Sequence, residues 1–174
     1  MRRVAIFFLA AAVLALLHAS FFTALGHPLS LINLPLVLVV SLAVGLRGGP
    51  AVGVAIVSGT VMDAISAVPY GTYTFALTLV SLVAVLSLST VLTHLSFISF
   101  LGANAGTFLI FHLSVFLTSA FTRLITGGDF LQPGIWGAFI SVISALPVQL
   151  AVCAAIRLAA GRFRKRQPGI VMLR

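Results

Sequence analysis

Long apolar runs, separated by short breaks rich in glycine, proline or polar residues, fill almost the whole of this 174-residue chain. A helix that crosses a membrane needs about 20 mainly apolar residues. A barrel strand would instead show alternating polarity over about ten residues, and lipid-exposed backbone must bond within its own segment. The pattern therefore predicts six helical spans, at about 4–25, 31–46, 51–67, 71–93, 97–122 and 134–159.

Composition places these helices in lipid. Hydrophobic residues make up 61% and charged residues 7% of the chain, whereas soluble domains carry about 25% charged residues. The predicted fold is an all-α integral membrane protein, a bundle of about six transmembrane helices. Residues 1–174 are expected to form a single transmembrane domain with a short basic tail at 161–174. The N-terminal run is expected to be a retained helix, because it is long and has no clear signal-peptidase site.

Basic residues indicate the orientation of the bundle. If both termini are cytoplasmic, every Lys and Arg except Arg123 lies on or near the cytoplasmic face, which is the positive-inside pattern. Tyr70, Tyr73 and Trp136 then fall at outer ends, where amphipathic rings favour the headgroup layer. The basic tail is expected to contact anionic lipids and not nucleic acid, because it follows a span directly.

Enzyme motifs are absent from the sequence. It contains no CxxC, GxxxxGK[ST] or HExxH. An intramembrane aspartyl protease needs two carboxylates at membrane depth, but the only acidic residues are Asp63 and Asp129, and Asp129 lies in a predicted loop. We therefore expect no catalytic activity, no cofactor and no metal.

Three ionisable residues are expected at similar depth, about 20 Å from the inner boundary of the membrane. They are His18, Asp63 and His112, from three different spans. A charged group at membrane depth costs roughly 2.5–3.5 kcal/mol and usually faces the bundle interior or water. Two interpretations of Asp63 stay open: a polar centre with one of the histidines, or a cap on the turn that "AVPYG" makes. Each histidine alone has the alternative of a hydrogen-bonded packing residue.

Small residues indicate where helices pack closely. Ala11, Ala15 and Ala19 recur every four residues in the first span, and Gly53 and Gly59 lie in the third. Small side chains let helix backbones approach in lipid, where no hydrophobic effect drives association. We expect the alanine strip to pack against the protein's own helices; a partner helix is the alternative.

The segment "INLPLVLVVSLAVGLRGGPAVGVAIVSGTVMDAISAVPYGTYTFALTLVSLVAVL" resembles the bacterial rod shape-determining protein MreD family over residues 30–85. The features that carry the resemblance are Pro35 in the second span, the glycine-bearing turn at 45–49, and Gly53, Gly59, Asp63, Ser66 and Gly71. The length, the six spans and the lack of extramembrane domains are also similar to that family.

The MreD resemblance implies a non-enzymatic scaffold of the elongation machinery in the bacterial inner membrane. It would bind the bitopic protein MreC and help link cytoplasmic MreB filaments to peptidoglycan synthases, namely RodA and its transpeptidase partner. The same region is also similar to substrate-binding subunits of energy-coupling-factor transporters, which have six helices and an Ala-x-x-x-Ala docking face on helix one. That resemblance implies the alternative function, a vitamin or small-molecule importer. The short outer loops and the scarcity of Trp, Tyr and Asn favour the scaffold.

Overall fold

The structure is a computed structural model that describes residues 2–21, 24–25, 30, 32–46, 49–66, 68–90, 97–126 and 135–165. These ranges contain six α-helices and no strand. The helices are α1 (Arg2–Ser20), α2 (Leu34–Leu46), α3 (Gly49–Ile65), α4 (Thr72–Thr90), α5 (Phe97–Ile125) and α6 (Ile135–Lys165). The all-α class is thus confirmed for the described residues, and each helix coincides with one predicted apolar segment. Asp129 and the predicted tail from 166 onward lie outside them.

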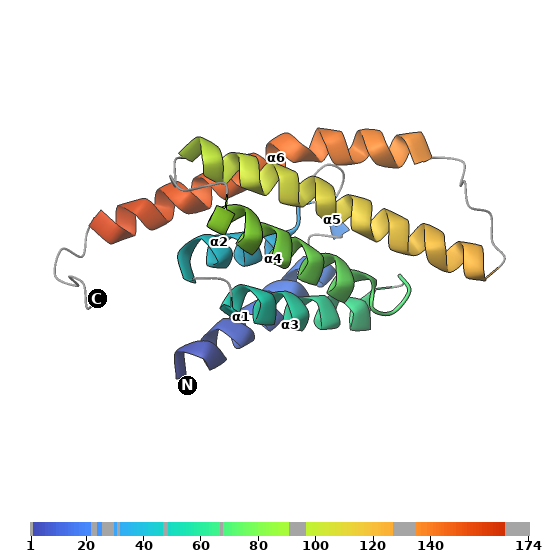
Figure 1. The fold of residues 1–174 in the computed structure, drawn as a ribbon, viewed down its shortest axis with the longest axis horizontal. Coiled ribbons are helices and arrows are strands. Elements are labelled where there is room, and N and C mark those ends of the chain that lie inside the picture. Colours follow the sequence, from blue (N-terminus) through green and yellow to red (C-terminus); the bar gives the residue numbers. More distant parts are fainter. Residues whose placement is uncertain are drawn as a thin grey trace.

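Consecutive helices run in alternating directions along the long axis of the molecule (Figure 1). The first residues of α1 and the last residues of α6 consequently lie at the same end of the bundle. In the interior, α3 packs against α1, α2 and α4, and α4 also packs against α5. The outermost helix, α6, packs mainly against α5. It contains Pro147, and it changes direction part-way along (Figure 1), as expected where a proline removes a helical hydrogen bond.

Helix length separates α5 and α6 from the other four helices. Segments Phe100–Ile125 and Phe139–Leu158 are long and apolar enough to cross a membrane, whereas the apolar segments described in α1 to α4 have 10–17 residues. Large apolar side chains nevertheless cover outward faces throughout; Leu9 is 67% exposed, Phe121 62% and Ile140 64%. Two helices therefore have the dimensions of a span, and six spans remain a prediction.

The alanine strip of α1 faces α3. Ala11 and Ala15 are both 0% exposed and belong to the main buried cluster, while Ala19 is half-buried. The Ser58 hydroxyl of α3 donates to the Ala11 carbonyl at 3.5 Å. Five residues before that serine, a Cβ on Gly53 would lie 2.8 Å from the Phe8 ring of α1. In this structure Ala11 and Ala15 therefore pack inward, toward the protein's own helices.

Ala15→Leu should lower the stability of the isolated protein in detergent. The three added heavy atoms have no space at a fully buried position, and overpacking of this kind costs about 1–3 kcal/mol. Thermal denaturation measures the effect, with Ala155→Leu on the exposed side of α6 as the matched control. An Ala15→Leu variant that melts like the wild type but loses a partner protein would contradict inward packing.

Candidate functional site at the junction of α3 and α4

A tight turn carries the chain from α3 into α4. The Thr72 amide and hydroxyl donate to the Pro69 carbonyl, at 3.2 and 2.7 Å. Gly71, at the third position of this turn, has a φ of 93°, which matches the positive φ that a type II turn requires there and that favours glycine. The Gly71 carbonyl then accepts the first helical bond of α4, from the Phe75 amide at 2.9 Å. Gly71 therefore opens the fourth helix, as the sequence pattern predicts.

The first turn of α4 is capped by a carboxylate from α3. The Tyr73 amide donates to Asp63 Oδ1 at 2.8 Å. The Thr74 amide and hydroxyl donate to Asp63 Oδ2, at 3.0 and 2.6 Å. The first amides of a helix have no partner within it, and the helix dipole favours negative charge at this end. Both oxygens of Asp63, which is 4% exposed, are thus engaged by the start of the next helix.

Gly59 lets the two helices approach closely enough for this cap. It lies one turn before Asp63, so the two positions share a face of α3. A Cβ on Gly59 would lie 2.4 Å from Thr74 Cα and 2.8 Å from Thr74 N. The G-x-x-x-D spacing therefore has a geometric meaning: the glycine admits the backbone of α4, and the aspartate binds its amides. Together with the Gly71 turn, these contacts form what we term the α3–α4 joint, defined by Gly59, Asp63 and Gly71.

Of the two interpretations of Asp63, the structure shows the capping role. All three of its hydrogen bonds come from α4, and none comes from a histidine. His112 Nδ1 lies 3.0 Å from the Phe108 carbonyl of its own helix. The buried His18 bonds to the backbone of Ile32 and interacts electrostatically with His112. Asp63 and the histidines are therefore not brought into one hydrogen-bonded centre, and no cluster able to hold a metal occurs among the described residues.

An aromatic chain connects the capped turn to α5. The Tyr73 ring stacks on Phe111, with centroids 6.2 Å apart, and Phe111 meets His112 edge-on at 5.2 Å. Such pairs stabilise packing by about 0.5–1.5 kcal/mol beyond area burial. Ser66, the last residue of the predicted motif, closes the final turn of α3 through its amide, which donates to the Met62 carbonyl at 2.9 Å. Its hydroxyl does not join the cap.

Sequence reasoning missed a second set of polar contacts, between α2 and α6. The Asn33 side chain caps α2 by accepting from the Leu36 amide at 3.0 Å. The Asn33 amide donates to Gln149 Oε1 at 3.0 Å, and Gln149 Nε2 donates back to the Asn33 carbonyl at 3.4 Å. Both residues are buried, at 2% and 0% exposure. An asparagine two residues before a proline signals a helix start, and a lone glutamine in an apolar span signals an interhelical contact.

A further polar contact fixes α6 on α5. Cys153 Sγ donates to Asn104 Oδ1 at 3.2 Å, and both side chains are buried. Cys153 is therefore a packing residue with a weak hydrogen bond, as its position in the last span suggests. The two asparagines of the chain thus each connect α6 to another helix.

Comparison with known proteins leaves the family open. No family model matches the chain, and neither curated proteins nor solved structures gave a significant match. The resemblance to the MreD family consequently stays a prediction.

Proposed function

We propose that this protein is a non-enzymatic, MreD-like scaffold of the rod-shape elongation machinery in the bacterial inner membrane. It binds an MreC-like bitopic protein and thereby helps link MreB filaments to the RodA and transpeptidase pair. One observation carries the proposal: Gly59, Asp63 and Gly71, three of the residues that carry the resemblance, form an internal joint between α3 and α4. The motif therefore holds two helices of the protein in a fixed arrangement, as a scaffold requires.

Several features support six membrane spans with both termini in the cytoplasm. The helices alternate in direction, and α1 begins at the same end of the bundle as α6 ends (Figure 1). Exposed apolar side chains cover the outward faces of the described helices, and contiguous apolar surface marks contact with a membrane or a partner. Every basic residue except Arg123 then lies on or near the inner face. Helices shorter than the bilayer core are compatible with spanning, because the bilayer thins around them.

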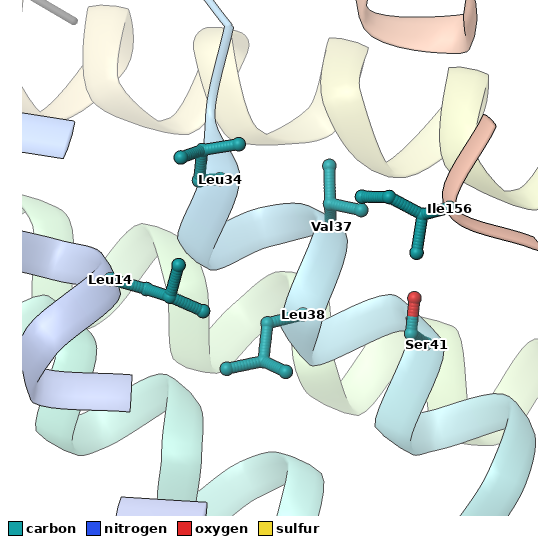
Figure 2. Close-up of a pocket in the computed structure, with 6 residues that line it drawn as sticks. All are labelled: Leu14, Leu34, Val37, Leu38, Ser41 and Ile156. Carbon is teal, nitrogen blue, oxygen red and sulfur yellow. The ribbon is translucent and has the colours of Figure 1, made fainter. Parts of the chain in front are cut away.

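The buried alanine strip favours the scaffold over the importer. An importer subunit of the energy-coupling-factor type would present its Ala-x-x-x-Ala face to a transport partner. Here Ala11 and Ala15 are fully covered, and the Ser58 contact places the strip against α3. The described groove on α2 is lined by apolar side chains and one serine (Figure 2), which offers few groups to orient a polar vitamin.

Purification in a gentle detergent tests the scaffold function. The tagged protein should retain an MreC-like single-pass protein that is co-expressed with it, and should lose that protein when its transmembrane helix is replaced by an unrelated apolar helix. Depletion of the chain should convert rod-shaped cells to round ones. Co-purification of an ATPase pair or a bound vitamin, with normal cell shape after depletion, would establish the importer instead.

A further inference from the structure

Helices α5 and α6 continue past the level at which α2 and α4 begin. The Tyr73 ring, in the first turn of α4, stacks on Phe111 of α5, and α5 continues from Phe111 for 14 more residues. On α6, Gln149 bonds to Asn33, the residue before α2 begins, and α6 has 14 residues before Gln149. Both helices therefore continue for about 21 Å along their axes, and α5 reaches past the turn between α3 and α4 (Figure 1).

The projecting part of α5 has an apolar surface. Between 113 and 125 only Ser114 and Ala120 are buried. Contiguous apolar surface of this kind is covered by lipid or protein and not by water. The large apolar side chains, which are 39–70% exposed, are Leu113, Phe116, Leu117, Phe121, Leu124 and Ile125.

The end of α5 has the residue expected where a membrane meets water. Arg123 is exposed and lies two residues before the helix ends. Long basic side chains near the end of a span extend to the headgroup layer. Under the membrane arrangement proposed above, the outer surface of the bilayer beside α5 therefore lies close to Arg123, about 18 Å further along the helix than Phe111.

The α3–α4 joint indicates a lower outer surface on the opposite flank. Helices α1 and α3 lie on that flank, and α2 and α4 separate them from α5 and α6 (Figure 1). Tyr70, three residues before Tyr73 in the turn of the joint, is 81% exposed, and tyrosine rings favour the headgroup layer. The headgroup layer of this flank is therefore expected near the level of Phe111 and not near that of Arg123.

Helix lengths differ in the same sense between the two flanks. Helix α3 has 17 residues and is about 26 Å long. The apolar segment Phe100–Ile125 of α5 has 26 residues and is about 39 Å long. A bilayer core of about 30 Å lies between these two lengths, so one flat bilayer matches neither flank.

We propose that the protein imposes a step in bilayer thickness. The bilayer is thinner along α1 and α3, where lipids with short acyl chains are favoured, and thicker along the projecting part of α5, where longer chains are favoured. The physical reason is hydrophobic mismatch, because each ångström of mismatch between a helix and the bilayer costs free energy that the lipids relieve by adjusting thickness. The inference depends on the proposed membrane arrangement and not on the scaffold role.

Tryptophan fluorescence at matched positions on the two flanks tests the step. Trp136 is the only tryptophan, so Trp136→Phe provides a background without one. Ile56→Trp near the middle of α3 and Leu113→Trp near the middle of the α5 segment replace side chains that are 43% and 56% exposed. Each variant is reconstituted with a brominated phosphatidylcholine, which quenches tryptophan on contact, and with unbrominated phosphatidylcholines of shorter or longer chains that compete with it.

We expect short-chain lipid to relieve quenching best at Ile56→Trp and long-chain lipid to relieve it best at Leu113→Trp. The relative affinities should differ by about twofold or more between the two positions, as mismatch energies of a fraction of a kcal/mol per ångström imply. Leu9→Trp on α1, 67% exposed, should behave like Ile56→Trp, and Leu117→Trp on α5, 55% exposed, like Leu113→Trp. The result therefore does not depend on one variant folding.

Three outcomes would overturn the step. Equal chain-length preferences on both flanks would show a tilted bundle in a flat bilayer. Quenching of Leu113→Trp by aqueous iodide and not by brominated lipid would place the projecting part of α5 outside the bilayer. If iodide also quenches Ile56→Trp and brominated lipid does not, the proposed membrane arrangement itself fails. No partner protein is present in these measurements, so they do not bear on the scaffold function.

Discussion

Gly59→Ala should destabilise the protein by about 2–3 kcal/mol, although alanine is a better helix former than glycine. A Cβ at this position would lie 2.4 Å from Thr74 Cα and 3.0 Å from the Tyr73 carbonyl oxygen. Both are backbone atoms, so no side-chain rotation relieves the overlap, and overpacking of this kind costs 1–3 kcal/mol or more. The start of α4 must then move away from α3, which also lengthens the bonds to Asp63. Thermal denaturation in detergent measures the loss.

Gly106→Ala provides the matched control for Gly59→Ala. Gly106 also lies inside a helix, α5, but a Cβ there would have no heavy atom within 4 Å. Alanine should therefore stabilise this position, by up to about 1 kcal/mol from helix propensity alone. Opposite signs for the two substitutions would show that close approach of α4, and not glycine content in general, accounts for Gly59. A Gly59→Ala variant as stable as Gly106→Ala would contradict the joint.

Apolar run length was sufficient to locate the helices. Breaks in the hydrophobic pattern fall where the chain turns, and the turn residues carry local signals: Asn33 caps α2, and Gly71 supplies a positive φ before α4. These signals are contained in a few neighbouring residues, so they can be read without tertiary information. The end of α6 was the least accurate boundary: the helix continues to Lys165, past the predicted 159, because basic residues are compatible with a helix beyond the apolar span.

The contacts between helices could not be read in the same way. A helix that is apolar on all sides has no pattern to indicate which face is inward, so the pairing of Asn33 with Gln149, 116 residues away, has no local signal. Asp63 presents a different obstacle. Its partners are the backbone amides of Tyr73 and Thr74, and a backbone amide is present at nearly every position. The sequence shows that a membrane carboxylate needs donors, and only the fold shows which donors.

Asp63→Leu should lower the stability of the protein more than Asp63→Asn does. Leucine removes both acceptor oxygens and leaves the amides of Tyr73 and Thr74 and the Thr74 hydroxyl without a partner in a part-buried site. Leaving buried donors unsatisfied costs about 1–3 kcal/mol per group, so a total loss of roughly 3 kcal/mol or more is expected. Asparagine keeps one oxygen but places an NH₂ group opposite either the Tyr73 amide or the two Thr74 donors. Its loss should therefore be intermediate, about 1–2 kcal/mol.

Thr74→Val separates the side-chain bond of the cap from its backbone bonds. Valine has nearly the same shape as threonine, so it removes only the 2.6 Å hydroxyl bond to Asp63 Oδ2 and keeps the 3.0 Å bond from the Thr74 amide. We expect a loss of about 1 kcal/mol. Hydrogen exchange provides a readout specific to the cap: relative to the wild type, exchange of the Tyr73 and Thr74 amides should be fastest in Asp63→Leu, intermediate in Asp63→Asn and nearly unchanged in Thr74→Val. If Asp63→Leu melts and exchanges like the wild type, the carboxylate does not hold α4, and the G-x-x-x-D segment needs another explanation.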